Sequence, residues 1–153
     1  MNKIIFLLII ISALASCNKK ENCAEIQTKA PESEVSNLKN YLTTNSISAT
    51  EDARGFFYII ANTGTGNKPT ICSSVTVNYE GKLSNGTSFD SGTNVSFALS
   101  GLIEGWKEGI PLIAQGGKIT LYLPPSLAYG INGSGSIPGN ANLIFIIDLV
   151  AVN

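Results

Sequence analysis

The sequence predicts an α+β domain in which a curved antiparallel sheet of about five strands wraps around one short α-helix. From residue 54 onward, short apolar runs follow one another and are separated by Gly, Asn and Pro, a texture typical of strands and turns. Only one later segment has helical spacing. Hydrophobic residues make up 44% of the 153 residues, so the chain can bury a real core.

The first segment, residues 1–16, has the features of a bacterial lipoprotein signal peptide. Lys3 precedes an apolar run of about a dozen residues, which is too short for a membrane-spanning helix of roughly 20. The run ends in Leu-Ala-Ser before Cys17, which resembles a lipobox, so we expect cleavage before Cys17 and its acylation. An ordinary signal peptide is the alternative. Asn18 favours attachment to the outer membrane of the cell envelope, on either its periplasmic or its surface face.

The remaining cysteines, Cys23 and Cys72, form an even pair once Cys17 is modified. In an oxidising compartment such a pair favours a disulfide bond. Cys72 also stands at the start of an apolar alternating run, so a buried free thiol is the alternative. The sequence leaves both open.

A polar linker, residues 17–30, leads into a helical segment over residues 31–53. We expect its helix at residues 31–46, because Pro31 suits a first turn and acidic residues favour a helix start. A narrow apolar stripe recurs at helical spacing, formed by Val35, Leu38 and Leu42. The sequence therefore adds an N-terminal helical extension to the domain at residues 54–153.

The apolar runs of this domain define its strands. We expect strands at residues 56–61, 75–79, 95–99, 118–123 and 143–152. The stretch Leu143–Ile147 is apolar at every position, which predicts a central strand that is covered on both faces.

The single helical pattern within the domain consists of Ile103, Trp106 and Ile110, and Pro111 stops it. Gly105 and Gly109 each weaken a helix by about 1 kcal/mol, so this helix must rest on the sheet.

Composition excludes several classes of function. With 10 basic and 11 acidic residues, net charge −1, the chain lacks the basic surface of a nucleic-acid binder. It contains no His, which rules out Ser-His-Asp and Cys-His catalysis and His-based metal sites. The segment Gly64–Lys68 lacks the spacing of a phosphate-binding loop. We therefore expect neither a cofactor nor a metal.

Aromatic side chains are spread through the strand domain: Tyr79, Phe89, Phe97, Trp106, Tyr129 and Phe145. A hydrophobic core alone would explain the Phe and Trp residues. The hydroxyls of Tyr79 and Tyr129 and the carboxylate of Asp90 need partners wherever they are buried. This combination predicts a small apolar pocket with a few oriented polar groups.

Five segments, in this order, carry a family resemblance: residues 77–81, 85–91, 103–109, 123–130 and 137–145. Over about residues 54–152 the chain resembles the FKBP-type peptidyl-prolyl isomerases. The resemblance implies a curved antiparallel sheet on a short helix, and a pocket for a proline ring with Trp106 as its floor. It implies catalytic roles for Tyr79, Asp90, the Ile103 backbone N–H and Tyr129. It implies further substrate contacts from Phe89, Phe97, Leu102, Ile137 and Phe145.

Isomerisation suits a chain without His, because rotation about an X–Pro bond breaks no bond and needs no base. The expected partners are proline-containing polypeptides that fold in the envelope, and the membrane through Cys17. The rim of the pocket is expected to offer fewer contacts than in many family members, because of Val95, Ser134, Ser136 and the short loop after Phe97. Macrolide-type ligands are therefore expected to bind weakly. Two alternatives stay open: a non-catalytic proline-peptide-binding or chaperone module, and a structural lipoprotein whose aromatic residues are only core.

Overall fold

The computed structural model describes residues 28–153. The predicted signal peptide, Cys17, Cys23 and most of the linker lie outside the described residues. The helices and strands, in chain order, are α1 Glu32–Thr44, β1 Thr50–Glu51, β2 Phe57–Asn62, β3 Ser74–Leu83, β4 Ser88–Ala98, α2 Glu104–Gly109, β5 Lys118–Leu123 and β6 Leu143–Val152. Short 3₁₀ turns occur at Leu99–Gly101, Ile110–Leu112 and Pro125–Leu127. None of the helices in residues 28–153 is long and apolar enough to cross a membrane.

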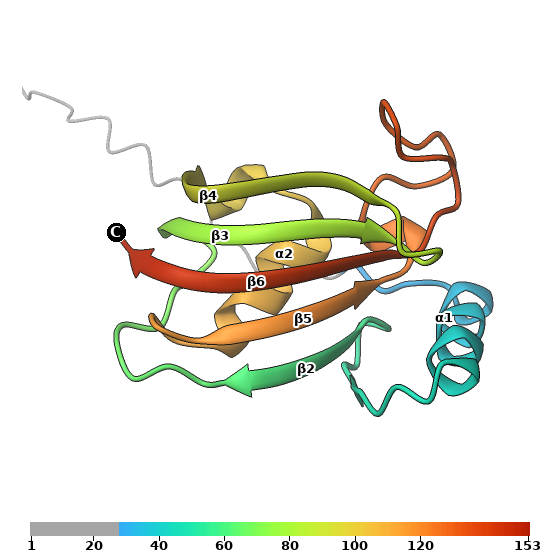
Figure 1. Ribbon diagram of the computed structural model, residues 1–153, viewed down its shortest axis with the longest axis horizontal. Helices are drawn as coiled ribbons and strands as arrows, with labels where there is room; N and C mark the ends of the chain where they lie inside the picture. The colour runs from blue at the N-terminus through green and yellow to red at the C-terminus, as the bar shows by residue number, and fades with distance from the viewer. Residues whose placement is uncertain (1–27) are drawn as a thin grey trace, which may run out of the picture.

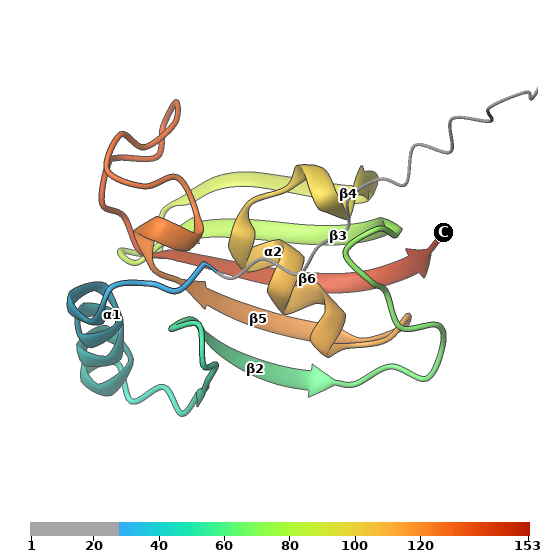
Figure 2. The same ribbon diagram turned by 180° about the vertical axis from the view of Figure 1, so that it is seen from behind.

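The strands form one curved sheet in the order β1-β2-β5-β6-β3-β4, with antiparallel neighbours throughout. Helix α2 lies across one face of the sheet, and α1 lies at one end of it (Figures 1 and 2). The predicted α+β architecture is therefore confirmed. The sheet has a sixth strand because the two-residue β1 pairs with β2.

Strand β6 occupies the middle of the sheet, between β5 and β3, as its apolar sequence predicts. Its inward side chains are buried: Leu143, Phe145, Ile147 and Leu149. Ile144 and Ile146, which alternate with them, are only half-buried. The expectation of cover on both faces was wrong, because α2 covers only one face and α1 sits at the end of the sheet (Figure 1).

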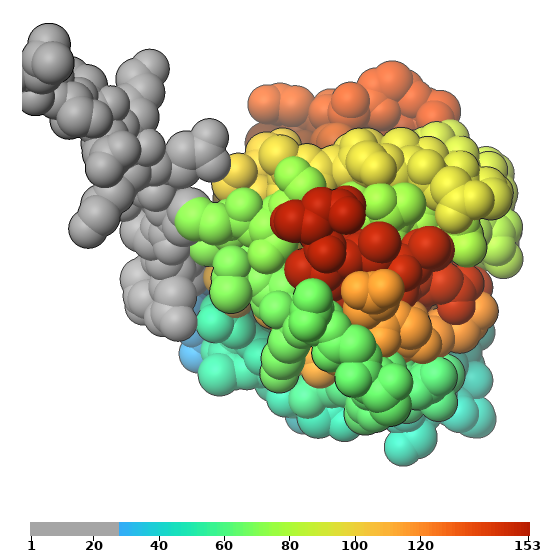
Figure 3. All heavy atoms as spheres, turned by 90° about the vertical axis from the view of Figure 1, so that its left-hand side faces the viewer, coloured from blue at the N-terminus to red at the C-terminus, as the bar shows by residue number. Residues whose placement is uncertain are grey.

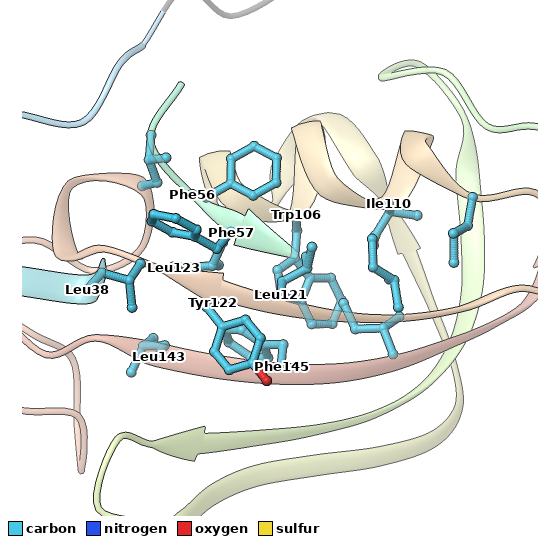
Figure 4. Close-up of a cluster of buried hydrophobic side chains, with 14 of the residues drawn as sticks. Leu38, Phe56, Phe57, Trp106, Ile110, Leu121, Tyr122, Leu123, Leu143 and Phe145 are labelled. Atoms are coloured by element: carbon cyan, nitrogen blue, oxygen red, sulfur yellow. The ribbon is translucent and has the colours of Figure 1, made fainter. Parts of the chain in front are cut away.

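Helix α2 approaches β5 closely, and its two glycines make this approach feasible. A Cβ atom at Gly105 would lie under 3.0 Å from the Leu123 side chain, and one at Gly109 would crowd Leu121 in the same way. Figure 4 shows Trp106 extending from α2 toward the strands. The glycines weaken the helix but allow it to seat Trp106 deep against the sheet.

Helix α1 joins the same hydrophobic core. The predicted stripe of Val35, Leu38 and Leu42 is buried and packs in one cluster with Phe57 and Tyr122 (Figure 4). Burial of this face, more than intrinsic propensity, stabilises a 13-residue helix. The N-terminal extension is therefore packed on the strand domain.

The opposite end of the sheet carries the β2–β3 connection and the end of β6 (Figure 3). The N–H of Asn153 donates to the Ser74 carbonyl over 2.8 Å, which joins the two segments. Cys72 lies in this connection, is exposed, and is disulfide-bonded. Its predicted partner, Cys23, lies outside the described residues, so that pairing stays a prediction.

Candidate active site

A small cavity of about 110 Å³ lies between α2, β3, β4 and β6. It is lined by Tyr79, Asp90, Phe97, Leu102, Ile103, Trp106 and Phe145. All seven are among the site residues that the sequence suggested. The lining is apolar apart from one phenol and one carboxylate, which is the composition of a ligand pocket.

Trp106 is the centre of the aromatic arrangement. Its side chain is 4% exposed, and three rings meet it edge-on. The centroid of its ring lies 5.3 Å from that of Tyr79, 6.0 Å from that of Phe97 and 5.2 Å from that of Phe145. Interplanar angles of 81–89° are those that aromatic quadrupoles favour. The indole is thus held in place by rings from strands β3, β4 and β6, which lie opposite α2.

Phe89 does not line the cavity. Its ring lies 5.6 Å from the ring of Phe145, nearly perpendicular to it, and packs against this part of the lining. The direct contact with substrate that the sequence suggested for Phe89 stays a prediction.

Tyr79 and Asp90 come from the paired strands β3 and β4. The Tyr79 hydroxyl donates to Asp90 Oδ2 over 2.9 Å, and Asp90 Oδ1 accepts the Ser91 N–H over 2.9 Å. Burial, together with this hydrogen bond and the negative charge of Asp90, raises the pKa of Tyr79 to about 12. Tyr79 is therefore a neutral phenol at physiological pH, and its proton is directed to the carboxylate.

A bulge in β4 sets the orientation of Tyr79. The β3–β4 register shifts between Val77 and Tyr79, and the displaced Asn94 donates its N–H to Asn78 Oδ1 over 2.8 Å. A Cβ atom at Gly92 would lie 2.6 Å from the Tyr79 ring. The bulge and the glycine together let the ring lie against the backbone of β4 and point at the cavity.

Ile103 stands at the start of α2 in an extended conformation, with φ −63° and ψ 153°. Its carbonyl accepts the N–H groups of Trp106 and Lys107, which begins the helix. Among residues 28–153, no acceptor is recorded for the Ile103 N–H. This donor is available at the cavity wall.

Tyr129 and Ile137 do not belong to the cavity lining either. Tyr129 is 38% exposed and follows the Pro125–Leu127 turn. Burial and the charge of Asp90 raise its pKa, which places the phenol within electrostatic reach of that carboxylate. Ile137 is 8% exposed, and its carbonyl accepts the Ser134 N–H across a tight turn in the loop between β5 and β6. Tyr129 is thus partly exposed on the loop that follows β5, and Ile137 is buried within that loop.

Two features of the site were not predicted from the sequence. Strand β4 begins at Ser88, so Phe89 and Asp90 lie on a strand and not after a turn; the polar run from Ser88 to Asn94 gave no strand signal. The second is a hydrogen bond from the Ser126 N–H to Glu34 of α1, which spans 92 positions of the chain. No local pattern signals such a contact.

With this geometry established, comparison with known proteins defines the class. A family profile for FKBP-type peptidyl-prolyl cis-trans isomerase matches residues 66–150. The chain belongs to this family.

Its relatives include two bacterial groups. The FKBP-type peptidyl-prolyl cis-trans isomerase FkpA of Aeromonas hydrophila is 38% identical over 146 residues, which cover 93% of this chain and 52% of that protein. The peptidyl-prolyl cis-trans isomerase Mip of Coxiella burnetii is 42% identical over 105 residues, 65% of this chain and 46% of Mip. The chain thus spans about half the length of these curated relatives.

Solved structures agree on the fold. The crystal structure of FkpA from Escherichia coli superimposes with a TM-score of 0.72 and 36% identity, over 79% of this chain and 60% of that one. A peptidyl-prolyl cis-trans isomerase from Pseudomonas syringae gives a TM-score of 0.70 at 32% identity, over 82% of this chain and 98% of that one. Both structures thus share the fold over most of this chain.

Proposed function

We propose that the chain is a peptidyl-prolyl cis-trans isomerase that binds the proline ring of its substrate against Trp106. One observation carries the proposal, the lining of the apolar cavity of about 110 Å³. The indole of Trp106 forms its floor, and its walls carry the hydrogen-bonded Tyr79–Asp90 pair and the Ile103 N–H, which has no acceptor among residues 28–153. A proline ring is apolar and compact, and the adjoining amide is polar, so the two parts match the two kinds of lining.

The apolar lining provides the first part of catalysis. Rotation about the X–Pro bond is opposed by a barrier of about 18–20 kcal/mol, because the amide loses resonance when it twists. A twisted amide is less dipolar than a planar one. A cavity that removes water from the bond therefore favours the twisted form over either planar form.

Fixed donors provide the second part. We propose that the Ile103 N–H and the Tyr129 hydroxyl donate to the carbonyl oxygen as it rotates. Tyr129 stays protonated, because burial and the Asp90 charge raise its pKa. A total gain of about 7–8 kcal/mol would accelerate rotation by roughly 10⁵–10⁶.

Asp90 orients the wall. Its carboxylate holds the Tyr79 hydroxyl, so the Tyr79 ring keeps one edge toward Trp106. The roles of Asp90 and Tyr79 are thus mainly to fix the shape of the cavity.

A protease-coupled proline-peptide assay on the purified protein tests the proposal. We expect isomerisation well above the uncatalysed rate, and Trp106 fluorescence that changes on peptide binding. Binding of the peptide with no acceleration would instead identify a non-catalytic binding module. Absence of both would leave the aromatic residues as core.

We further propose that the protein works in the bacterial cell envelope, anchored at the outer membrane by acylated Cys17. The lipobox-like sequence at residues 14–17 and Asn18 support this placement. Its substrates would then be proline-containing polypeptides that fold there. Ser134 and Ser136 present small, exposed side chains on the loop before β6, which supports weak binding of bulky macrolide-type ligands.

A further inference from the structure

A carboxylate from the N-terminal extension reaches the loop that carries Tyr129. Glu34 Oε2 of α1 accepts the backbone N–H of Ser126 over 2.9 Å, in a half-buried setting. The sequence here is Leu-Pro-Pro-Ser-Leu-Ala-Tyr, residues 123–129.

This N–H needs an external acceptor. Pro124 and Pro125 have no N–H, so Ser126 provides the first donor of the turn Pro125–Leu127. The first donors of a helical turn have no acceptor within it, and no side chain of this turn caps them. A carboxylate fills the position with a charge-assisted bond, which is stronger than a neutral one.

The turn transmits this constraint to Tyr129. The N–H groups of Ala128 and Gly130 both donate to the Pro125 carbonyl, over 2.9 and 2.8 Å. Tyr129 lies between these two bonds. The Gly130 carbonyl in turn accepts the Asn140 N–H over 3.0 Å, at the base of the loop before β6. A shift of Ser126 would therefore move Tyr129.

A polar hollow of about 290 Å³ lies beside this bond, lined by Ser33, Glu34, Asn37, Pro125, Asn140 and Asn142. The buried face of α1 and Leu127 of the turn belong to the same hydrophobic cluster. The Glu34–Ser126 bond therefore adds a polar connection to the apolar packing between α1 and the turn.

We propose that Glu34 is a positioning residue of the isomerase site: it fixes the turn that presents the Tyr129 hydroxyl, and it makes α1 part of the catalytic unit. This inference rests on the proposed isomerase function. It assigns the helical extension a role in catalysis as well as in stability.

The test compares variants of the full chain. Glu34→Ala should lower kcat/KM about three- to tenfold, because the hydroxyl is no longer held for the transition state. Glu34→Gln should restore most of the rate, since its amide oxygen can accept the same N–H. Glu32→Ala is the matched control, because Glu32 is also acidic and in the first turn of α1 but is exposed. It should keep wild-type kcat/KM.

A double-mutant cycle separates positioning from a general loss of stability. If Glu34 acts through Tyr129, Glu34→Ala should lose its effect on the rate in a Tyr129→Phe background. Full additivity, equal losses in Glu34→Ala and Glu32→Ala, or no rescue by Glu34→Gln would each overturn the proposal.

Hydrogen exchange distinguishes a failure of the Glu34 proposal from a failure of the proposed isomerase function. Amides of residues 126–130 should exchange faster in Glu34→Ala than in wild type and Glu32→Ala, whether or not the protein is active. An inactive wild type with this exchange pattern would reject the isomerase function but support the contact. Unchanged exchange would reject the role of Glu34 even in an active enzyme.

Discussion

Removal of the Tyr129 hydroxyl is the sharpest probe of the proposed mechanism. Tyr129→Phe keeps the ring and deletes one donor. The side chain is 38% exposed, and its hydroxyl has no hydrogen-bond partner among residues 28–153. The substitution should therefore barely change the stability of the folded protein. We expect the free energy of unfolding to change by less than about 0.5 kcal/mol.

The effect on catalysis should be larger. A hydrogen bond made to the rotated carbonyl, and poorly made to the planar one, contributes roughly 1–2 kcal/mol to the transition state. Its loss corresponds to about a five- to thirtyfold lower kcat/KM. Affinity for a proline peptide should stay within about twofold, because the apolar floor at Trp106 is untouched.

The measurement is the protease-coupled assay together with urea unfolding of each variant. Tyr41→Phe is the control, because it removes a phenol hydroxyl from α1, away from the cavity. Wild-type kcat/KM in Tyr129→Phe would refute the role of the hydroxyl. An equal loss in Tyr41→Phe would show that the assay reports stability instead.

Four further predictions concern the remaining features. Asp90→Val should reduce kcat/KM more than tenfold while peptide still binds, since the Tyr79 ring loses its acceptor; unchanged activity in the peptide assay would remove Asp90 from the site. Cys17→Ala should abolish incorporation of labelled fatty acid, and label retained in that variant would contradict the lipoprotein assignment. A Cys23–Cys72 bridge closes about 50 residues and should contribute roughly 4 kcal/mol on the chain-entropy model; two free thiols titrated in the unreduced, unfolded protein would exclude it. Because the pKa of Tyr79 is raised in the folded protein, the unfolded chain loses this proton first as pH rises. The contribution of Tyr79 to stability is therefore complete below pH 10 and should be lost between pH 10 and about 12. Urea midpoints should fall less steeply with pH in Tyr79→Phe than in wild type, and identical slopes would argue against the raised pKa.

The sequence was most informative where hydrophobic pattern alone decides structure. Residues 118–123 and 143–152 match the bounds of β5 and β6, because strict alternation or continuous apolarity leaves one solution. The stripe of Leu38 and its neighbours likewise located the buried face of α1.

It was least informative where tertiary pairing overrides local propensity. The first half of β4 is polar and contains Gly92, yet β3 holds it in the sheet through the ladder and the Tyr79–Asp90 bond. Ile144 and Ile146 lie on the face of β6 that α2 does not cover, and they are only half-buried. This could not be predicted, because a continuous apolar run does not show how many layers cover a sheet.

For the site, residue identity was predictable but placement was not. The family resemblance selected the seven residues that line the cavity. The packing of the Phe89 ring against Phe145, and the reach of Glu34 to the turn before Tyr129, depend on three-dimensional packing that no short segment encodes.

The central position of β6 has a consequence for how the protein is made. Residues 143–152 are the last to be synthesised among the strands, yet they join β5 to β3 and supply Phe145. Until this segment has been made, a growing chain can hold only two separate pieces of the sheet, β1-β2-β5 and β3-β4. The sheet can close only then, in a step that brings together distant parts of the chain and is correspondingly slow. A nascent chain therefore cannot complete the cavity, which Phe145 helps to line, before synthesis has passed β6.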